Sequence, residues 1–275
     1  MKSPAKPILI FTILLLVVSA AYFIIVYYLN LTQTEGLEKE KTLTITYRSS
    51  QIPLDPNEPY WKNIEPVKIH LLPQNAILPF GTEERDIRVR GVFNDSEIAF
   101  LLEFDDATED RDAPSISATA SSRTTTLDRD AVSDRDTASN PDACAILFTP
   151  KNSPAAVQMM GYGSEANIWQ WSADRDAEQH QEGSETIRAV RELFASGPGT
   201  QAPMQGQNVE GKGAYKDGMW TVVFKRLLES RQEGEFAFSP GKDQKIAFAR
   251  WDGAKKETIS KKSVAIIQIL AMEKD

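Results

Sequence analysis

The sequence IRVRGVFNDSEIAFLLEFDD, residues 87–106, predicts a β-hairpin. Its two apolar segments, 87–93 and 98–106, are separated by the polar turn residues Asn94, Asp95 and Ser96. The second segment carries apolar side chains at successive positions rather than at alternate ones. Both faces of that strand should therefore be covered, and we expect it to lie inside the fold.

Strand patterns continue along the chain on both sides of this hairpin. They are found at residues 42–48, 67–72, 143–148, 220–228 and 246–253. One helix is predicted from an N-cap at Ser184 to Phe194, followed by a Gly/Gln/Pro-rich loop at 197–213. Many short strands with few short helices indicate a mainly β fold, arranged as a β-sandwich.

The N-terminal segment has the length of a membrane span. Residues 8–29 carry no charge, and a helix of that length, about 33 Å, crosses a hydrocarbon core of about 30 Å. Lysines precede it, so we expect a cytoplasmic N-terminus at 1–7, a transmembrane anchor at 8–29 and a stalk at 30–41. Residues 42–275 would then form one extracytoplasmic domain. A signal peptide cleaved after Val18-Ser19-Ala20 is the competing interpretation, but the apolar run continues beyond it.

A polar insertion interrupts this domain at residues 107–141. The tripeptide Asp-Arg-Asp occurs at 110–112, 128–130 and 134–136, with a fourth copy at 174–176. Each aspartate pair brackets an arginine, and the glycine turn and distal glutamate of a calcium loop are absent from the sequence. We expect a solvated, largely disordered insertion.

Charge and cysteine content exclude several classes of site. The net charge of −8 argues against a nucleic-acid surface. Cys144 is the only cysteine, so the sequence has no internal disulfide, no Cys-x-x-Cys-His for covalent haem and no cysteine cluster for zinc or iron–sulfur. A redox centre would need other ligands. No nucleophile–base pair or phosphate-binding loop stands out, so we expect no enzyme activity of its own.

The segment QMMGYGSEANIWQW, residues 158–171, carries candidate ligands. Alternation along this strand-like run places Trp169 and Trp171 on one face. The thioether of Met159 or Met160 is a soft ligand suited to iron or copper. On spacing alone, methionines near tryptophans are more often core filling than ligands.

With the later segments included, the chain resembles the haem b-binding γ subunits of molybdenum enzymes of the dimethyl sulfoxide reductase family. These enzymes include ethylbenzene dehydrogenase, dimethylsulfide dehydrogenase, the selenate and chlorate reductases, and nitrite oxidoreductase. The resemblance rests on an ordered series of short blocks: Asp55-Pro56 followed by Trp61, residues 67–74, 103–108, 142–148, Met160-Gly161 leading to 167–171, 218–226, 247–253 and 262–264.

The resemblance implies a β-sandwich that holds one non-covalent haem b between a methionine and a lysine. By their places in the matching blocks these are Met160 and Lys262, with Met159 and Lys261 as rivals. A lysine binds iron only as the neutral amine, so its site must be dry or the metal must displace the proton. Residues expected to line the pocket are Trp169, Trp171, Trp220 and Trp251, and Arg226 or Arg250 would pair with the haem propionates.

The two histidines offer an alternative ligand set. His70 lies on the polar face of its strand and His180 lies in a polar run, so we expect both near the surface. Ligation by two histidines, or by a histidine and a methionine, remains the alternative to the methionine–lysine pair.

The function implied is that of a membrane-anchored electron-transfer subunit on the periplasmic side. Its haem would relay single electrons between an iron–sulfur β subunit, attached to a molybdenum α subunit, and a c-type cytochrome or quinone carrier. Two alternative functions fit the same sequence. One is a carbohydrate-type binding module with exposed tryptophans and no haem, and the other is a structural anchor whose haem site has decayed. The N-terminal anchor and the polar insertion both depart from the family pattern.

Overall fold

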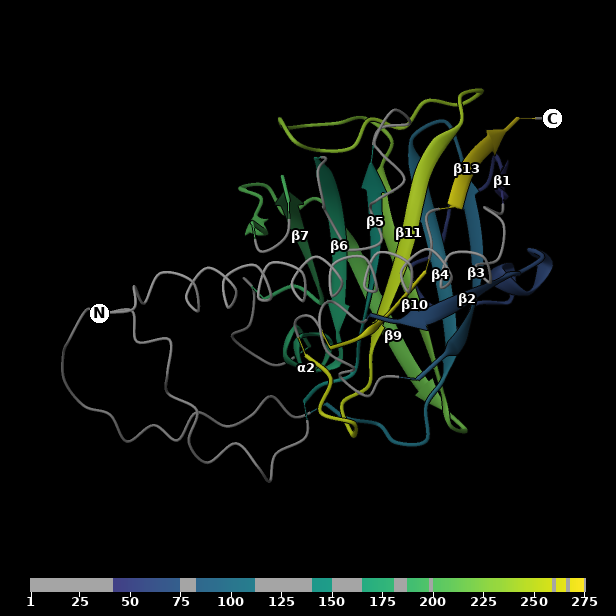
Figure 1. The fold of residues 1–275 in the computed structure, drawn as a ribbon. Helices are drawn as coiled ribbons and strands as arrows, with labels where there is room; N and C mark the ends of the chain where they lie inside the picture. The colour runs from purple at the N-terminus through teal and green to yellow at the C-terminus, as the bar shows by residue number, and fades with distance from the viewer. Residues whose placement is uncertain are drawn as a thin grey trace, which may run out of the picture. The chain divides into compact units, whose positions relative to one another are not determined.

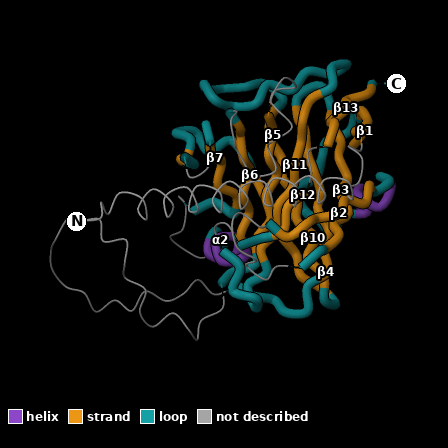
Figure 2. Tube along the Cα trace, in the orientation of Figure 1, coloured by secondary structure: helices purple, strands orange, loops and turns teal. Residues whose placement is uncertain are grey.

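The computed structural model describes residues 42–74, 83–111, 140–149, 165–180, 187–197, 200–258, 261–265 and 268–274. The strands are β1 (Thr42–Tyr47), β2 (Val67–Pro73), β3 (Arg85–Phe93), β4 (Glu97–Asp105), β5 (Ala143–Thr149), β6 (Ala166–Ser172), β7 (Val190–Ala195), β8 (Ala202–Pro203), β9 (Glu210–Lys216), β10 (Met219–Leu227), β11 (Gln244–Trp251), β12 (Ser263–Ala265) and β13 (Gln268–Glu273). In these ranges the helices are the 3₁₀ helix η1 (Pro59–Asn63) and α2 (Ala173–Glu178). The fold is mainly β, as predicted (Figure 2).

The strands form one sheet that folds back on itself. Their hydrogen-bonded order is β8-β7-β6-β5-β11-β12-β2-β3-β4-β10-β9, and β1 pairs with β13 and β3 (Figure 1). Strands β4 and β5 are not neighbours in this order, yet the ring centroids of Phe100 and Phe148 lie 5.7 Å apart. The ring centroids of Trp171 in β6 and Trp220 in β10, two strands that are also not neighbours in this order, lie 4.9 Å apart. The two halves of the sheet therefore face each other across an aromatic core, as in a β-sandwich.

The predicted hairpin is confirmed by β3 and β4. Its turn is fixed by the Asn94 side chain, which accepts hydrogen bonds from the backbone N–H groups of Ser96 and Glu97 at 2.9 and 2.7 Å. Phe100 of β4 points into the inner core, whereas Leu101 packs in a second cluster against Trp61 and its neighbours. Both faces of β4 are covered, which explains its continuous apolar sequence.

The helix predicted from Ser184 to Phe194 is wrong for the part that the structure describes. Residues 190–195 form β7, which pairs antiparallel with β6 from Trp171 opposite Val190 to Ala166 opposite Ala195. The spacing of the apolar residues fits either structure, and pairing with a buried neighbouring strand outweighs the weak local helix preference. Residues 184–186 lie outside the described residues.

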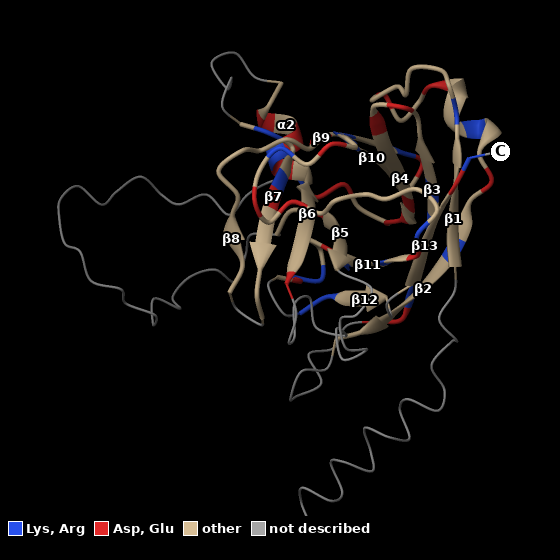
Figure 3. Ribbon diagram, turned by 90° about the horizontal axis from the view of Figure 1, so that it is seen from above, with Lys and Arg blue, Asp and Glu red and all other residues tan. Residues whose placement is uncertain are grey.

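The loop predicted at 197–213 is also partly wrong, because β8 and the first half of β9 lie within it. The glycines of β9 have a packing role rather than a turn role. A Cβ at Gly213 would overlap the indole of Trp171, and one at Gly211 would overlap the side chain of Val190. α2 lies beside this strand, and its Asp176 accepts a hydrogen bond from the Gly213 N–H at 3.3 Å (Figure 3).

Two predictions fall outside the described residues. The cytoplasmic N-terminus, anchor and stalk at 1–7, 8–29 and 30–41 belong to residues 1–41, and most of the insertion belongs to 112–139. In the described part of the chain, no helix has both the length and the apolar composition of a membrane span. The described strands and helices belong to one compact unit, residues 40–275.

The close contact between β9 and Trp171 gives a stability prediction. Gly213→Ala should lower the free energy of unfolding by about 1–3 kcal/mol, because the added methyl group forces the buried indole to move. Gly206→Ala is the matched control, since its Cβ would meet only the flexible side chains of Gln232 and Asn208. Urea unfolding of the two variants measures the difference, and equal midpoints would contradict this packing.

Candidate functional site

Lys262 is a buried lysine at the start of β12. Only 4% of its surface is exposed, and its Nζ lies 5.0 Å from the ring centroid of Trp251. Burial lowers the pKa of Lys262 to about 8 from the ordinary 10.5, because water that would solvate the ammonium is excluded. The neutral amine, which is the form that binds a metal, is therefore more populated at Lys262 than at a surface lysine.

Trp251 belongs to an apolar cluster on the outer face of one layer, which we call the alanine face. Its members are Ala143, Ala145, Leu147, Ala166, Ile168, Leu193, Ala195, Ala247, Ala249 and Trp251, and Val264 packs against them. These residues come from β5, β6, β7 and β11, and most are small. Small side chains leave a flat surface that a planar apolar group can approach closely. Lys262 and the alanine face together form the candidate site.

The structure brings Lys262 and Trp251 together and places the other predicted tryptophans elsewhere. Trp169, Trp171 and Trp220 lie in the inner core, so the predicted shared face of Trp169 and Trp171 is confirmed. The Nε1–H of Trp169 donates to Asn167 at 3.1 Å, and that of Trp220 donates to Asp142 at 2.9 Å. These three indoles fill the space between the layers, and their role in lining a pocket stays a prediction.

The two predicted arginines are held in separate buried ion pairs. Arg226 lies 3.4 Å from Glu192 and 5.3 Å from the ring centroid of Trp169. Arg250 donates to Asp106 at 2.7 Å. Each guanidinium group therefore has a carboxylate partner within the chain, and pairing with haem propionates stays a prediction for both.

Met159 and Met160 lie outside the described residues. The segment that carries them leaves β5 at Thr149 and enters β6 after Glu165, and the Thr149 hydroxyl donates to the Glu165 carbonyl at 3.2 Å. The two ends of this segment thus lie side by side. Beside them, an open cavity of about 420 Å³ is lined by Phe148, Asn167, Phe194, Phe236, Lys242 and Gln244 among others.

The rival ligands lie nearer the surface. Lys261 is half-buried, and its Nζ donates to the Lys255 carbonyl at 2.7 Å. His70 is half-buried with Nδ1 3.0 Å from Asp86, and exposed His180 has Nδ1 2.7 Å from the Asp176 carbonyl oxygen. The predicted surface positions of both histidines agree with the structure.

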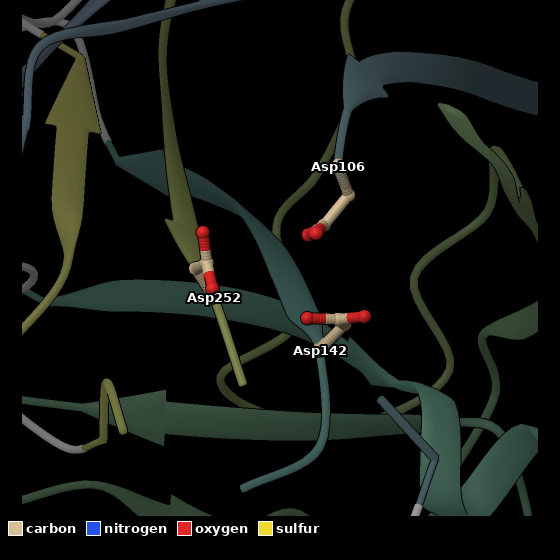
Figure 4. A group of neighbouring side chains, drawn as sticks. All are labelled: Asp106, Asp142 and Asp252. Atoms are coloured by element: carbon tan, nitrogen blue, oxygen red, sulfur yellow. The ribbon is translucent and has the colours of Figure 1, made fainter. Parts of the chain in front are cut away.

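Three buried aspartates form a cluster that the sequence did not reveal. Asp106, Asp142 and Asp252 each offer a carboxylate oxygen within 4.8 Å of the others, and their side chains point toward one another (Figure 4). Two of these carboxylates form ion pairs: Arg250 lies 2.7 Å from Asp106, and Arg85 lies 3.3 Å from Asp252. Asp142 instead accepts hydrogen bonds from N–H groups, so the cluster combines two ion pairs with one carboxyl group that has uncharged partners. Asp106 and Asp252 lie at the ends of predicted strands and Asp142 precedes one, but their convergence depends on how those strands pair.

Asp142 is the most perturbed member of the cluster. Burial, with a smaller contribution from the charge of Asp106, raises the pKa of Asp142 to about 7. Hydrogen bonds from the N–H groups of Gly253, Asp110 and Trp220, each 2.9 Å long, oppose this increase because they stabilise the ionised form. Asp142 thereby connects β5, β10 and the turn after β11.

A family model described as ethylbenzene dehydrogenase matches residues 58–204 and 192–263, which is most of the chain. The chain belongs to the ethylbenzene dehydrogenase family. This confirms the resemblance seen in the sequence. Met160, Lys262 and Trp251 all lie within the matched residues of this family member.

A relative from Haloferax mediterranei, ORF7, has been proposed to be a respiratory nitrate reductase heme subunit and is 27% identical over 217 residues. The match covers 78% of this chain and 66% of the relative, so the chain spans just under two thirds of that protein.

Two solved structures share a distant likeness with this family member. One is a family 9 carbohydrate-binding module from Caldicellulosiruptor kristjanssonii with glucose, at 8% identity and a TM-score of 0.46, covering 86% of this chain and 97% of that one. The other, from Bacteroides uniformis, is described as a proposed carbohydrate-binding protein, at 9% identity and a TM-score of 0.49, covering 86% and 100%. Likeness at this level says nothing about the ligand of the present chain.

The raised pKa of Asp142 predicts how stability changes with pH. Between about pH 4 and pH 7 the folded state holds a proton on Asp142 that the unfolded state releases, so this contribution to stability is lost as the pH rises through about 7. Asp142→Asn removes the titration. The stability difference between wild type and this variant should shrink by on the order of 1–3 kcal/mol from pH 5 to pH 8, measured by urea unfolding. A difference that stays constant over this range would contradict the assignment.

Proposed function

We propose that this chain is a haem-binding electron-transfer subunit of a molybdenum oxidoreductase, with no catalytic activity of its own. Membership of the ethylbenzene dehydrogenase family and similarity to a protein proposed to be a nitrate reductase heme subunit both support this function. The observation that carries the proposal is Lys262, buried against Trp251 beside the alanine face. An amine donor in a dry, flat, apolar site suits one side of a haem.

We further propose haem b, bound without covalent attachment, with Lys262 and Met160 as the axial ligands. Met160 lies five residues before Glu165, and five residues span at most about 17 Å. Strands rise about 3.3 Å per residue, so Met160 can reach the middle of the alanine face from the start of β6. Met159 and Lys261 are the rivals for these two positions.

Filled axial positions would limit the haem to the exchange of single electrons. The chain's own residues set the conditions for this. Burial beside Trp251 favours the neutral amine of Lys262 over its protonated form. The alanine face excludes water, and a thioether ligand such as Met160 tends to raise the reduction potential.

The proposed partners follow from the family. Electrons would pass between an iron–sulfur subunit, attached to a molybdenum subunit, and a c-type cytochrome or quinone carrier. The apolar segment at 8–29 would anchor the chain as a single-pass membrane protein, with residues 42–275 on the periplasmic side.

The rival function as a carbohydrate-binding module needs exposed tryptophan side chains for stacking on sugars. All five tryptophans lie in the described part of the chain, and each is buried, with Trp251 the most exposed at 6%. This removes the feature on which that rival rested. The remaining rival, an anchor with a decayed haem site, predicts that complex assembly and electron transfer survive in a Met160→Ala, Lys262→Ala double variant.

Axial ligation is tested by single substitutions in the full chain, made in an exporting host with haem supplied. Wild type should give a low-spin haem b spectrum, identified by the pyridine haemochrome assay. Lys262→Ala and Met160→Ala should each lose low-spin character and weaken haem binding by about tenfold or more, because an iron–ligand bond is removed. Lys261→Ala, His70→Ala and His180→Ala are the controls and should resemble wild type. Absence of haem from the folded wild-type protein would overturn the proposal.

The location of the haem is tested by filling the alanine face. Ala249→Leu adds bulk beside Trp251 and should reduce haem content by about tenfold or more, since the planar group can no longer lie flat. Ala99→Leu is the matched control, because Ala99 is equally buried but lies on the outer face of the other layer. Haem content per folded protein is the measurement, and equal losses in both variants would place the haem elsewhere.

A further inference from the structure

Gln74 is a buried glutamine directly after β2, and the oxygen of its side-chain amide has no hydrogen-bond partner among the described residues. Only 7% of Gln74 is exposed, and within the part of the chain that the structure describes its Oε1 accepts no hydrogen bond. A buried acceptor left without a partner costs about 1–3 kcal/mol. In native proteins such atoms occur at strained positions, at redox or catalytic sites, or where water or an ion binds.

The position of Gln74 is fixed by the pairing of β2 with β12. Pro73 lies opposite Ser263 and Leu72 lies opposite Val264 in this antiparallel pair. The next pair outward is Gln74 and Lys262, and the Gln74 N–H donates to the Lys262 carbonyl at 2.9 Å. Residues directly opposite in antiparallel strands have Cβ atoms about 4.5–5.5 Å apart on the same face of the sheet.

That shared face is the one that carries the candidate site. Val264 packs against the alanine face, and Lys262, two residues earlier, projects to the same side of the strand. The contact of Lys262 with Trp251 supports this orientation independently. Gln74 and Lys262 are therefore neighbours on the face where the haem is proposed to lie.

We propose that Gln74 is a positioning residue for the Lys262 ligand, an inference that rests on the proposed function. A neutral amine bound to iron keeps two N–H groups, and in a dry site each of them needs an acceptor. The Oε1 of Gln74 accepts one of these N–H groups and so holds the amine lone pair toward the iron. An uncharged amide suits this role, because a carboxylate would favour the protonated ammonium, which cannot bind metal.

Gln74→Leu tests the inference, with Gln244→Leu as the matched control. Gln244 is also 7% exposed, but its Oε1 accepts from the Ser239 N–H and its Nε2 donates to the Ala237 carbonyl. Removal of an unpartnered polar group should leave the haem-free protein as stable as wild type or more stable, whereas Gln244→Leu should destabilise it. Gln74→Leu should nevertheless weaken haem binding by about 10- to 100-fold, measured by haem titration of the full chain. Gln244→Leu should leave haem affinity within about twofold of wild type.

A second measurement does not depend on preparing haem-free protein. In holoprotein formed during expression, Gln74→Leu should show an increased high-spin fraction and a shifted reduction potential, and Gln244→Leu should show neither change. If Gln74→Leu matches wild type in affinity, spin state and potential while Lys262→Ala does not, the role of Gln74 is wrong and the proposed function stands. If wild type takes up no haem, the proposed function itself fails.

Discussion

The antiparallel pairing of β5 with β11 is the constraint on which the rest of the structure depends. Both strands are buried on both faces, with Ile146 opposite Phe248 on the inner side and Ala145 opposite Ala249 on the outer side. The large inner side chains fill the space between the layers. The small outer ones adjoin each other in this register, so they form one flat surface. Because small side chains bury little apolar area, at about 25 cal/mol per Å², each outer residue contributes less to stability than the large inner ones.

Buried charges in this fold are of two kinds. Arg85, Arg226 and Arg250 each meet a carboxylate, and together with Asp142 they tie strand ends and turns to one another. Arg226 and Arg250 also lie over rings of the inner core, 5.3 Å from the ring centroid of Trp169 and 4.8 Å from that of Phe104. Lys262 differs in that its Nζ lies over an aromatic ring, 5.0 Å from the ring centroid of Trp251. A cation over such a ring gains about 0.5–2 kcal/mol.

Local pattern was sufficient to predict β1, β2, β5, β10 and β11, the hairpin at β3 and β4, and the shared face of Trp169 and Trp171, since each depends on residues close in sequence. It failed at β7, where an apolar spacing that also fits a helix is decided by pairing with β6. The meeting of Asp106, Asp142 and Asp252 was beyond sequence reasoning because it depends on strand order. The family resemblance predicted Lys262 as a ligand. The position of Gln74 beside it is visible only from the register of β2 with β12.

The energetics of Lys262 connect the fold to the proposed function. A pKa of about 8 in place of 10.5 corresponds to about 3 kcal/mol against the charged form, which the contact with Trp251 offsets only in part. In the proposed function, binding of the neutral amine to iron would remove that cost. The bound amine would also supply an N–H donor to the buried Oε1 of Gln74, which has no hydrogen-bond partner among the described residues. Two features that are unfavourable in the haem-free chain, a desolvated ammonium and an unpartnered amide oxygen, would thus be relieved together by one ligand, and this coupling is the physical reason to consider Gln74 and Lys262 as parts of one site.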